Sequence, residues 1–334
     1  MKVLVTGGTG FIGSHLVKKL VDEKNEVKCL VRKDSNTNFL KNLRIELVVG
    51  DTTDKNSLKN ITDDIDVIYH LAAIVNHKKT VKSYQEHYNV SVTGTENLVK
   101  SCLDSKIKKF VYVSSIAAIG LRNRKMLLDE NVECRPNTLY GKAKFEAEKM
   151  LLGYFNKNNF PVAIVRPSSI YGEGDSKGSI LSLARFVNNR IKKNQPYPFF
   201  SHGKNTTSLC YVKNLVKGFS IVGENGESGE VYHIADARPY TIKEMVETIA
   251  DVLGGNLKKI SIPKSFVWLG SLFFEPFKII GLNPPLYLRK YVEMTANSAF
   301  DISKIRKLGY DPEDNFKKFI SNTVNWQKEN RLID

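Results

Sequence analysis

The sequence predicts a doubly wound α/β fold built on a parallel sheet, and three observations support that prediction. Short apolar runs rich in valine and isoleucine alternate with amphipathic stretches along the first half of the chain. The runs are apolar on both faces, as is typical of strands that helices cover above and below. A glycine-rich turn joins the first run to the first amphipathic stretch. Repeated strand–helix units of this kind predict right-handed crossovers.

Each element of the first half has its own signal. The runs that predict strands are Val3–Val5, Val27–Val31, Leu47–Val49, Val67–Tyr69, Phe110–Val113 and Val162–Val165. The stretches with helical spacing are Phe11–Val21, Val90–Leu103 and Thr138–Phe155. We therefore expect residues 1–166 to form the main sheet domain, with segments near 205–235 returning to it.

The second half is less regular. After about Arg166, loops with glycine and proline interrupt the alternation, so we expect residues 167–334 to form a smaller, mixed region. One helix is well marked there, because Thr241 and Glu244 form a capping box and Gly254 ends the run. The stretch 263–288 is strongly apolar. It predicts either a helical pair packed on the core or an apolar wall or lid over an apolar substrate, which could touch a membrane surface.

Composition excludes several classes of protein. The chain has 334 residues, of which 42% are hydrophobic and 25% charged, so it is neither disordered nor collagenous. Its net charge of +15 comes from scattered lysines without a nucleic-acid-binding motif, which favours a solvated surface. The four cysteines and six histidines show no metal-ligand spacing, so we expect no metal. No signal peptide or spanning segment is visible, and we expect a soluble cytoplasmic protein.

The glycines at positions 7, 10 and 13 follow the first predicted strand and open the first predicted helix. Their G-x-x-G-x-x-G spacing is related to the dinucleotide fingerprint. Such glycines permit a tight turn and let backbone N–H groups approach a pyrophosphate at the helix N-terminus, where the dipole favours anions. The sequence therefore predicts a Rossmann domain that binds a dinucleotide.

The end of the second predicted strand should select the dinucleotide. An Asp or Glu about 20 residues past the glycines would bind the ribose 2′-hydroxyl of NAD. This chain has Arg32 and Lys33 there, with no carboxylate before Asp34. A guanidinium can grip a phosphate with two hydrogen bonds and stack on adenine, which suits a 2′-phosphate. We therefore expect NADP, with NAD as the alternative.

Ser115, Tyr140 and Lys144 form a candidate catalytic group. Ser115 lies just after the predicted strand Phe110–Val113, and Tyr140 and Lys144 are four residues apart in a predicted helix. Both side chains then point from one helix face. A lysine cation beside a phenol stabilises the phenolate, so we expect a lowered Tyr140 pKa and an acid/base group usable near neutral pH.

With these motifs in place, the chain resembles an extended short-chain dehydrogenase/reductase, in the superfamily that also contains nucleotide-sugar epimerases and dehydratases. The resemblance covers nearly the whole chain, and its motifs are Thr6–Gly13, Gly50 with Asp51, His70–Ala73, Tyr140 with Lys144, Arg166 with Pro167, and Tyr171 with Gly172. It implies that Ser115 hydrogen-bonds the substrate oxygen, Tyr140 transfers its proton and Lys144 holds the nicotinamide ribose. It also implies a homodimer.

The resemblance further implies which residues contact the cofactor. Asp51 would meet the adenine amino group, Ala72 would line the cofactor, and residues 167–169 would flank the nicotinamide amide. The expected set is Gly7, Thr9, Gly10, Phe11, Ile12, Gly13, Arg32, Asp51, Thr52, Leu71, Ala72, Ala73, Ser114, Tyr140, Lys144, Pro167 and Ser169.

Departures from the family pattern indicate a branch. Dehydratases carry two carboxyl residues after the catalytic strand, whereas this chain has Ile116 and Ala117, so dehydration is disfavoured. Nucleotide-sugar enzymes commonly place a phosphate-binding arginine where Thr207 stands, although Arg185, Arg190 or Arg289 could substitute. The chain is more similar to dihydroflavonol reductases, 3β-hydroxysteroid dehydrogenases and hopanoid-associated sugar epimerase-like proteins.

Three functions follow from these observations. The first is a hydride transfer between NAD(P) and a hydroxyl or ketone of an apolar or polyol-like small molecule, with Tyr140 as acid/base. The second is a nucleotide-sugar 4-epimerase that holds NAD tightly. The third is a dinucleotide-binding sensor without catalysis, which would not require Ser115, Tyr140 and Lys144 together.

Overall fold

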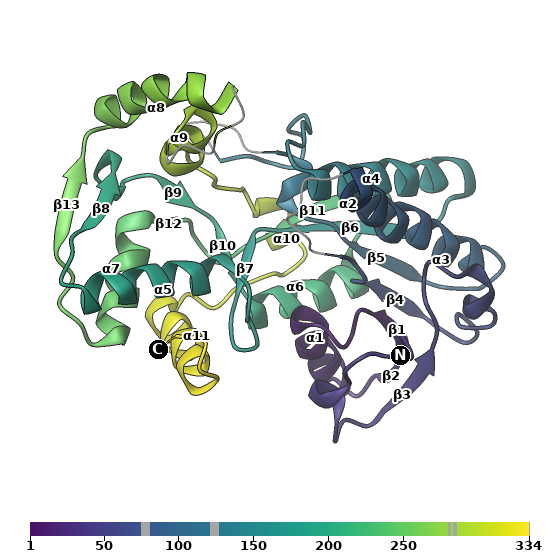
Figure 1. The fold of residues 1–334 in the computed structure, drawn as a ribbon. Helices are drawn as coiled ribbons and strands as arrows, with labels where there is room; N and C mark the ends of the chain where they lie inside the picture. Colours follow the sequence, from purple (N-terminus) through teal and green to yellow (C-terminus); the bar gives the residue numbers. More distant parts are fainter. Residues whose placement is uncertain (75–80, 121–126, 280–281, 283–285, 334) are drawn as a thin grey trace.

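A seven-stranded parallel sheet organises the computed structural model, which describes residues 1–74, 81–120, 127–279, 282 and 286–333 (Figure 1). The strand order is β11-β6-β5-β4-β1-β2-β3. The strands are β1 (Lys2–Thr6), β2 (Glu26–Val31), β3 (Ile45–Val49), β4 (Val67–His70), β5 (Lys109–Val113), β6 (Val162–Pro167) and β11 (Val231–Ile234). This order confirms the predicted doubly wound fold, because the chain runs outward from β1 in both directions.

Helices cover both faces of the sheet. They are α1 (Phe11–Asp22), α2 (Val81–Tyr88), α3 (Gly94–Cys102), α4 (Leu139–Asn158), α6 (Val212–Asn225) and the short α10 (Ser303–Arg306), with turns η1 (Asn38–Leu40), η2 (Lys55–Leu58) and η4 (Ile116–Ala118). A π-helical turn, η3 (Asn89–Thr93), precedes α3. We call these elements and the seven strands the sheet region.

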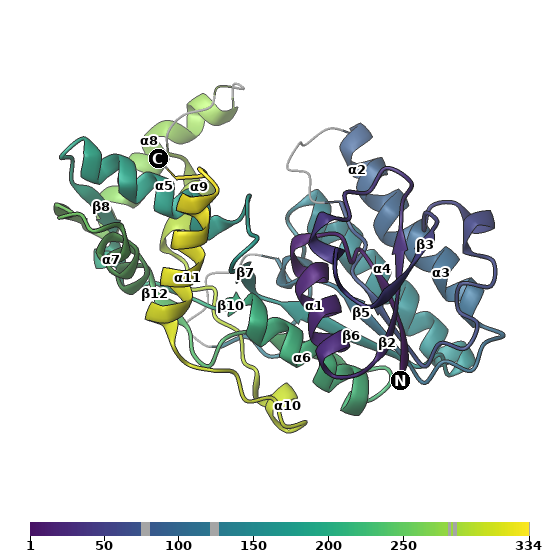
Figure 2. The ribbon, with the colours of Figure 1, turned by 90° about the horizontal axis from the view of Figure 1, so that it is seen from below.

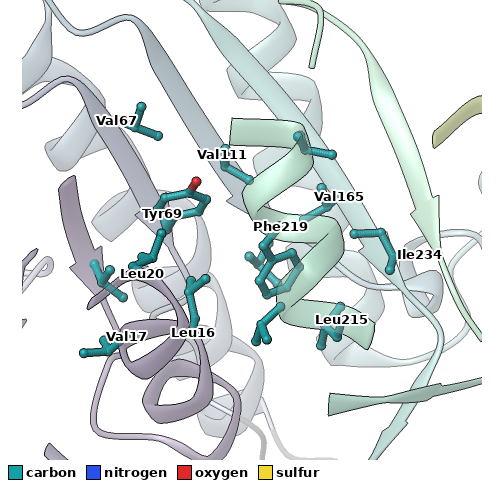
Figure 3. Packing of buried hydrophobic residues seen from close by; sticks show 14 of the residues in the cluster. Leu16, Val17, Leu20, Val67, Tyr69, Val111, Val165, Leu215, Phe219 and Ile234 are labelled. Atoms are coloured by element: carbon teal, nitrogen blue, oxygen red, sulfur yellow. The ribbon is translucent and has the colours of Figure 1, made fainter. Parts of the chain in front are cut away.

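The alternation of side chains along each strand explains the two covered faces. Val67, Tyr69, Val111 and Val165 point to the face where Leu16 and Leu20 of α1 meet Leu215 and Phe219 of α6 (Figure 3). The intervening residues, such as Ile68, Phe110 and Ile164, pack with α3 and α4 on the other face. Both faces of the central strands are therefore buried, as the sequence predicts.

The edge strand β3 is an exception. It was expected to be covered on both faces, but its Leu47 is 45% and its Val49 63% exposed. In the strand order β3 has only β2 beside it. The prediction of two-sided burial is wrong here because apolar runs of an edge strand and a central strand look alike in sequence.

The second part of the molecule, the C-terminal region, contains three two-stranded sheets and five helices among its described residues, and it lies beside the sheet region (Figure 2). Its strands are β7 (Ser169–Tyr171), β8 (Tyr197–Phe200), β9 (Thr206–Thr207), β10 (Leu209–Tyr211), β12 (Tyr240–Thr241) and β13 (Lys259–Ile262). Its helices are α5 (Ser179–Lys192), α7 (Ile242–Leu253), α8 (Lys264–Ile279), α9 (Leu288–Thr295) and α11 (Phe316–Glu329), and η5 (Ser201–Gly203) is a short turn.

Stacked aromatic rings form much of the core of this region. Phe319 of α11 lies 4.1 Å from the Tyr211 ring, and Phe316 lies 4.0 Å from the Tyr240 ring. Half of the capping box predicted for α7 is confirmed: the Glu244 N–H donates to Thr241 Oγ1 at 3.0 Å, and Gly254 ends the helix at φ 73°. The Glu244 carboxylate accepts from Arg238 at 2.6 and 3.1 Å instead of completing the box.

The apolar stretch 263–288 contains α8, which pairs with α9. Val267 and Ser271 of α8 are buried, whereas most of its large apolar side chains are exposed. The expectation of a helical pair packed on the core is thus met on one side of α8 only. Along the described parts of the chain, no helix is long and apolar enough to cross a membrane.

Candidate active site

The carboxyl ends of the parallel strands bring the candidate residues to one edge of the sheet. The glycine loop follows β1, Arg32 follows β2, Asp51 follows β3 and Ser115 follows β5. Leu71, Ala72 and Ala73 follow β4, Pro167 ends β6 and Ser169 begins β7. β1 and β4 flank the point where the strand order reverses, which is where ligands bind in open α/β sheets.

The glycine loop has the shape that a pyrophosphate requires. Gly7 has a φ of +74°, and a Cβ there would lie 2.9 Å from the Ala72 nitrogen. A Cβ on Gly13 would lie 2.1 Å from the Gly7 carbonyl oxygen. Gly10 is the N-cap of α1 and offers no side-chain cap, so the first N–H groups of the helix stay available to a ligand. Thr9, Phe11 and Ile12 complete the loop, and these residues fit a dinucleotide.

His70 connects three elements under this loop. Thr95 Oγ1 donates its only proton to the Ser91 carbonyl oxygen, so it must accept from His70 Nε2. His70 Nδ1, 2.6 Å from Thr6 Oγ1, is then an acceptor, and Thr6 Oγ1 in turn accepts from the Ala72 N–H at 3.2 Å. Burial lowers the pKa of His70 to about 3, which keeps the ring neutral. His70 is therefore a structural link between β1, β4 and α3.

Arg32, Asp51 and Thr52, which were expected to contact the cofactor, lie where β2 and β3 end. The Arg32 side chain is 64% exposed, and its Nε lies 4.0 Å from Asp34 Oδ1. Asp51 Oδ1 accepts from the N–H and the hydroxyl of Thr53, each at 2.8 Å. The Thr52 carbonyl accepts from Asn97 Nδ2 at 3.0 Å, which fixes the loop after β3 against α3.

Ser115, Tyr140 and Lys144 lie together, as the sequence predicts from their spacing. Ser115 caps η4, Tyr140 lies in the first turn of α4, and their side chains share a hydrogen bond. Lys144 is buried, with its Nζ donating to the Val113 carbonyl oxygen at 2.7 Å. Gly141 permits this close packing, because a Cβ there would lie 2.2 Å from the Ala117 carbonyl oxygen.

The electrostatics of this group differ from the expectation. Burial raises the pKa of Tyr140 to about 12, and the hydrogen bond with Ser115 acts in the opposite direction. Burial also lowers the pKa of Lys144 to about 7, while Glu148 raises it. Lys144 Nζ lies 6.0 Å from the Tyr140 ring centroid and 4.7 Å from that of Tyr112. The lowered Tyr140 pKa expected from the sequence is wrong for this structure, because desolvation of the buried phenol has the largest effect on that pKa.

A buried ion pair behind Lys144 was not anticipated from the sequence. Arg166 Nε and its terminal nitrogen donate to the two carboxylate oxygens of Glu148 at 3.0 and 2.6 Å. The Ser114 hydroxyl also donates to Glu148, so it faces this ion pair although Ser114 was expected to contact the cofactor. The sequence did contain one signal that Glu148 lies near the site, because Glu148 follows Lys144 by four residues and therefore lies on the same helix face.

His87 of α2 is a second residue that sequence analysis did not assign. It is fully buried, and its ring meets the Tyr140 ring edge-on at 6.0 Å.

Within the described ranges, no three His, Cys, Asp or Glu side chains are placed to share a metal ion.

The sequence pattern of the NAD dependent epimerase/dehydratase family matches residues 3–235, which contain every candidate residue above. The chain belongs to this family. The resemblance to extended short-chain dehydrogenases/reductases is thereby confirmed, and so is the coarser expectation of an enzyme that uses a nicotinamide dinucleotide.

Relatives in this family carry out different reactions. The 3-beta-hydroxysteroid dehydrogenase of Mycolicibacterium neoaurum is 29% identical over 93% of this chain and 87% of its own length. The N-acetyl-alpha-D-glucosaminyl-diphospho-ditrans,octacis-undecaprenol 4-epimerase of Escherichia coli O157:H7 is 26% identical over 92% of this chain and 89% of its own length. Family membership therefore leaves the reaction type open.

A solved structure shows the same fold. The UDP-glucose 4-epimerase of Thermotoga maritima, crystallised with UDP-glucose, superimposes with a TM-score of 0.77 at 20% identity. The match covers 99% of this chain and all of that chain. At this identity the similarity concerns the fold of both regions.

Proposed function

We propose that this protein is an NADP-dependent oxidoreductase that interconverts a hydroxyl and a ketone on a small apolar molecule. The observation that supports it best is the convergence of Ser115, Tyr140 and Lys144 at the dinucleotide edge of the sheet, with Ser115 hydrogen-bonded to Tyr140. This arrangement offers one hydrogen-bond donor and one proton donor to a substrate oxygen.

In this proposal, Ser115 binds the substrate oxygen and Tyr140 transfers the proton that accompanies the hydride. When bound, the dinucleotide supplies or accepts the hydride. Ser115 donates a hydrogen bond to the substrate oxygen, and Tyr140 gives its proton to that oxygen during reduction. Since burial raises the Tyr140 pKa to about 12, the phenol keeps its proton at neutral pH and is ready to act as an acid. Protonated Lys144, supported by Glu148, would hold the nicotinamide ribose and ease the charge that develops on Tyr140.

The mechanism is tested with Tyr140→Phe, which keeps the ring and removes the proton. We expect kcat for ketone reduction to fall about 10²–10⁴-fold while dinucleotide affinity is retained. The matched control is Tyr154→Phe on the same helix, whose hydroxyl donates to Glu96 at 3.1 Å away from the site. Full activity of Tyr140→Phe would contradict the proposed role of Tyr140, whereas dinucleotide binding without any turnover by the unmodified protein would favour the non-catalytic sensor.

The preference for NADP rests on Arg32 and Lys33 at the end of β2. A guanidinium that binds a 2′-phosphate contributes a charge-assisted hydrogen bond, so Arg32→Ala should weaken NADP binding about 10–100-fold and leave NAD binding unchanged. Calorimetric titration with both dinucleotides measures this. Tighter binding of NAD by the unmodified protein, with no effect of Arg32→Ala on NADP, would contradict the preference.

Two arguments support an apolar substrate over a nucleotide sugar. Thr207 stands where a phosphate-binding arginine is expected, and two alternative cations are engaged elsewhere. Arg185 Nε donates to the Leu332 carbonyl at 2.7 Å, and Arg190 donates to Gln195 at 3.0 Å; the Arg289 side chain lies outside the described part. Relatives named for a steroid and for an undecaprenol-linked sugar also handle molecules with large apolar parts.

Epimerisation is the second candidate, because two similar proteins are named as 4-epimerases. An epimerase returns the hydride to the same substrate, so it shows no net consumption of NADPH and retains its dinucleotide through purification. Stoichiometric NADPH oxidation with a ketone would support the reductase.

The homodimer and the cytoplasmic location stay predictions of the family resemblance and the sequence. Analytical ultracentrifugation at several protein concentrations tests the first, and fractionation of the source cell tests the second.

A further inference from the structure

Helix α8 lies at the periphery of the C-terminal region (Figures 1 and 2), and its exposed side forms an apolar surface. We call it the α8 surface and define it by the exposed side chains Phe266, Trp268, Leu269, Leu272, Phe273 and Phe277. Phe266 is 67% and Phe273 68% exposed, and Leu269 between them is 55% exposed. These three residues are three to four positions apart, so they follow one another along a single stripe of the helix.

Two polar side chains of α8, those of Glu275 and Ser271, are turned away from this surface. The carboxylate of Glu275 accepts a hydrogen bond from the Leu288 N–H at 2.7 Å, at the start of α9. Ser271 is buried, and its hydroxyl donates to the Trp268 carbonyl within the helix. The acidic residue of α8 is thus directed toward its partner helix.

Cations lie at the start of the surface. Lys264 is the first residue of α8, and Lys258 and Lys259 flank the beginning of β13, the strand that leads into it. All three are exposed, although Lys259 is paired with Glu247 at 2.6 Å. Between residues 258 and 295 the sequence has six Lys and Arg against two Glu, a local charge of +4.

This combination fits a lipid surface with anionic headgroups. Phe, Trp and Leu partition to the boundary between headgroups and acyl chains, and nearby lysines are attracted to anionic lipids. The 16 residues of α8 span about 24 Å, less than the roughly 30 Å hydrocarbon core, so the helix can lie in the interface but not cross it.

A second copy of the chain fits less well. At this surface the local charge of +4 on one copy would face the same charge on the other, while an anionic bilayer attracts it. Lysine is also depleted in the cores of protein–protein interfaces.

We propose that the α8 surface docks this protein on an anionic bilayer, with the Phe266–Phe273 stripe inserted at the headgroup boundary. Docking requires no turnover, so it is independent of the proposed reaction. Its consequence for the reaction would be access to substrates that reside in the bilayer.

Flotation with vesicles tests the proposal. The full chain is mixed with vesicles of phosphatidylcholine alone or with 30% phosphatidylglycerol, a composition chosen to give an anionic surface. We expect recovery with the anionic vesicles only, and lower recovery at higher ionic strength. The double variant Phe266→Ser/Phe273→Ser should partition to the vesicles at least about tenfold less, because it lacks the two aromatic side chains that would be buried at the headgroup boundary.

Two further variants separate the contributions. Phe39→Ser removes a side chain that is 58% exposed on η1 in the sheet region, and it should bind vesicles like the unmodified protein. Lys258→Gln/Lys264→Gln should reduce partitioning to anionic vesicles about tenfold. A circular dichroism spectrum and a thermal unfolding curve like those of the unmodified protein show that each variant is folded.

Either of two results would overturn the proposal. One is equal vesicle binding by the unmodified protein and by Phe266→Ser/Phe273→Ser. The other is an absence of binding by the unmodified protein to anionic vesicles. If the unmodified protein is then a dimer that this double variant dissociates, the surface is an interface between two copies.

Discussion

The sheet region and the C-terminal region are stabilised in different ways. In the sheet region, central strands four to six residues long are buried on both faces, and the polar groups of His70 and Glu148 are enclosed in hydrogen bonds. In the C-terminal region, paired strands of two to four residues surround stacked aromatic rings, and α8 leaves an apolar side uncovered. The residues proposed for proton transfer therefore lie on the regular, closely packed part of the molecule, while the irregular part leaves an apolar helix side exposed.

The largest effect is expected at the buried ion pair of the sheet region. Glu148→Gln leaves the Arg166 guanidinium buried without its anion, which should lower the free energy of unfolding by about 3–5 kcal/mol. Glu148 also raises the Lys144 pKa, so its loss should move the cation's titration to lower pH. Denaturant unfolding and the pH profile of kcat/KM measure the two effects.

The control lies on the same helix. Glu146 pairs with Lys149 at 2.8 Å on the surface, and Glu146→Gln should change the free energy of unfolding by no more than about 1 kcal/mol. Equal changes in the free energy of unfolding would show that the buried ion pair stabilises the fold no more than the exposed pair.

A comparable loss is expected in the core of the C-terminal region. Phe319 is 1% exposed and stacks on Tyr211, so Phe319→Ala should lower the free energy of unfolding by about 3–5 kcal/mol. If the regions are as distinct as their packing indicates, dinucleotide affinity measured by calorimetry stays unchanged. Phe39→Ala, at an exposed position, is the control and should cost less than about 0.5 kcal/mol. A large loss of dinucleotide affinity would contradict this independence.

The smallest effect concerns Asp236, which joins the two regions. Its carboxylate accepts from Tyr211 N–H at 2.9 Å, Asn214 Nδ2 at 2.8 Å and the Tyr171 hydroxyl at 3.0 Å. Burial raises the pKa of Asp236 from 3.8 to about 6. The native state then binds more protons than the unfolded state between these values, so this carboxyl lowers stability as pH rises from about 4 to about 6.

Asp236→Asn removes that dependence. The free energy of unfolding of the unmodified protein, relative to the variant, should fall by about 1–3 kcal/mol across this pH range. Thermal or denaturant unfolding at several pH values measures it, and parallel pH curves for both proteins would contradict the prediction.

The sequence predicted the parts of the fold that repeat. Central strands and the helices α1, α4 and α7 follow from hydrophobic periodicity and capping residues, and the positions of the glycine loop and of Ser115, Tyr140 and Lys144 follow from parallel strands ending at one edge. Roles for these residues stay predictions until variants are measured.

Other features depend on contacts between distant segments. β13 pairs with β8, some 60 residues earlier, and no local pattern encodes that register. The pKa of Tyr140 depends on how deeply the packed protein buries the phenol, so spacing to Lys144 alone gave the wrong direction. The Glu148–Arg166 pair joins α4 to β6, and either residue alone looks like an ordinary surface charge in the sequence.

The one-way order of hydrogen bonds through Thr6, His70 and Thr95 has a consequence for the dinucleotide edge. Every proton in that series is already assigned to an acceptor, so an additional one at His70 Nδ1 would have to break the hydrogen bond that this nitrogen accepts from the Thr6 hydroxyl. The electric potential beside the glycine loop should therefore stay constant across the acidity range in which solvent-exposed histidines change charge.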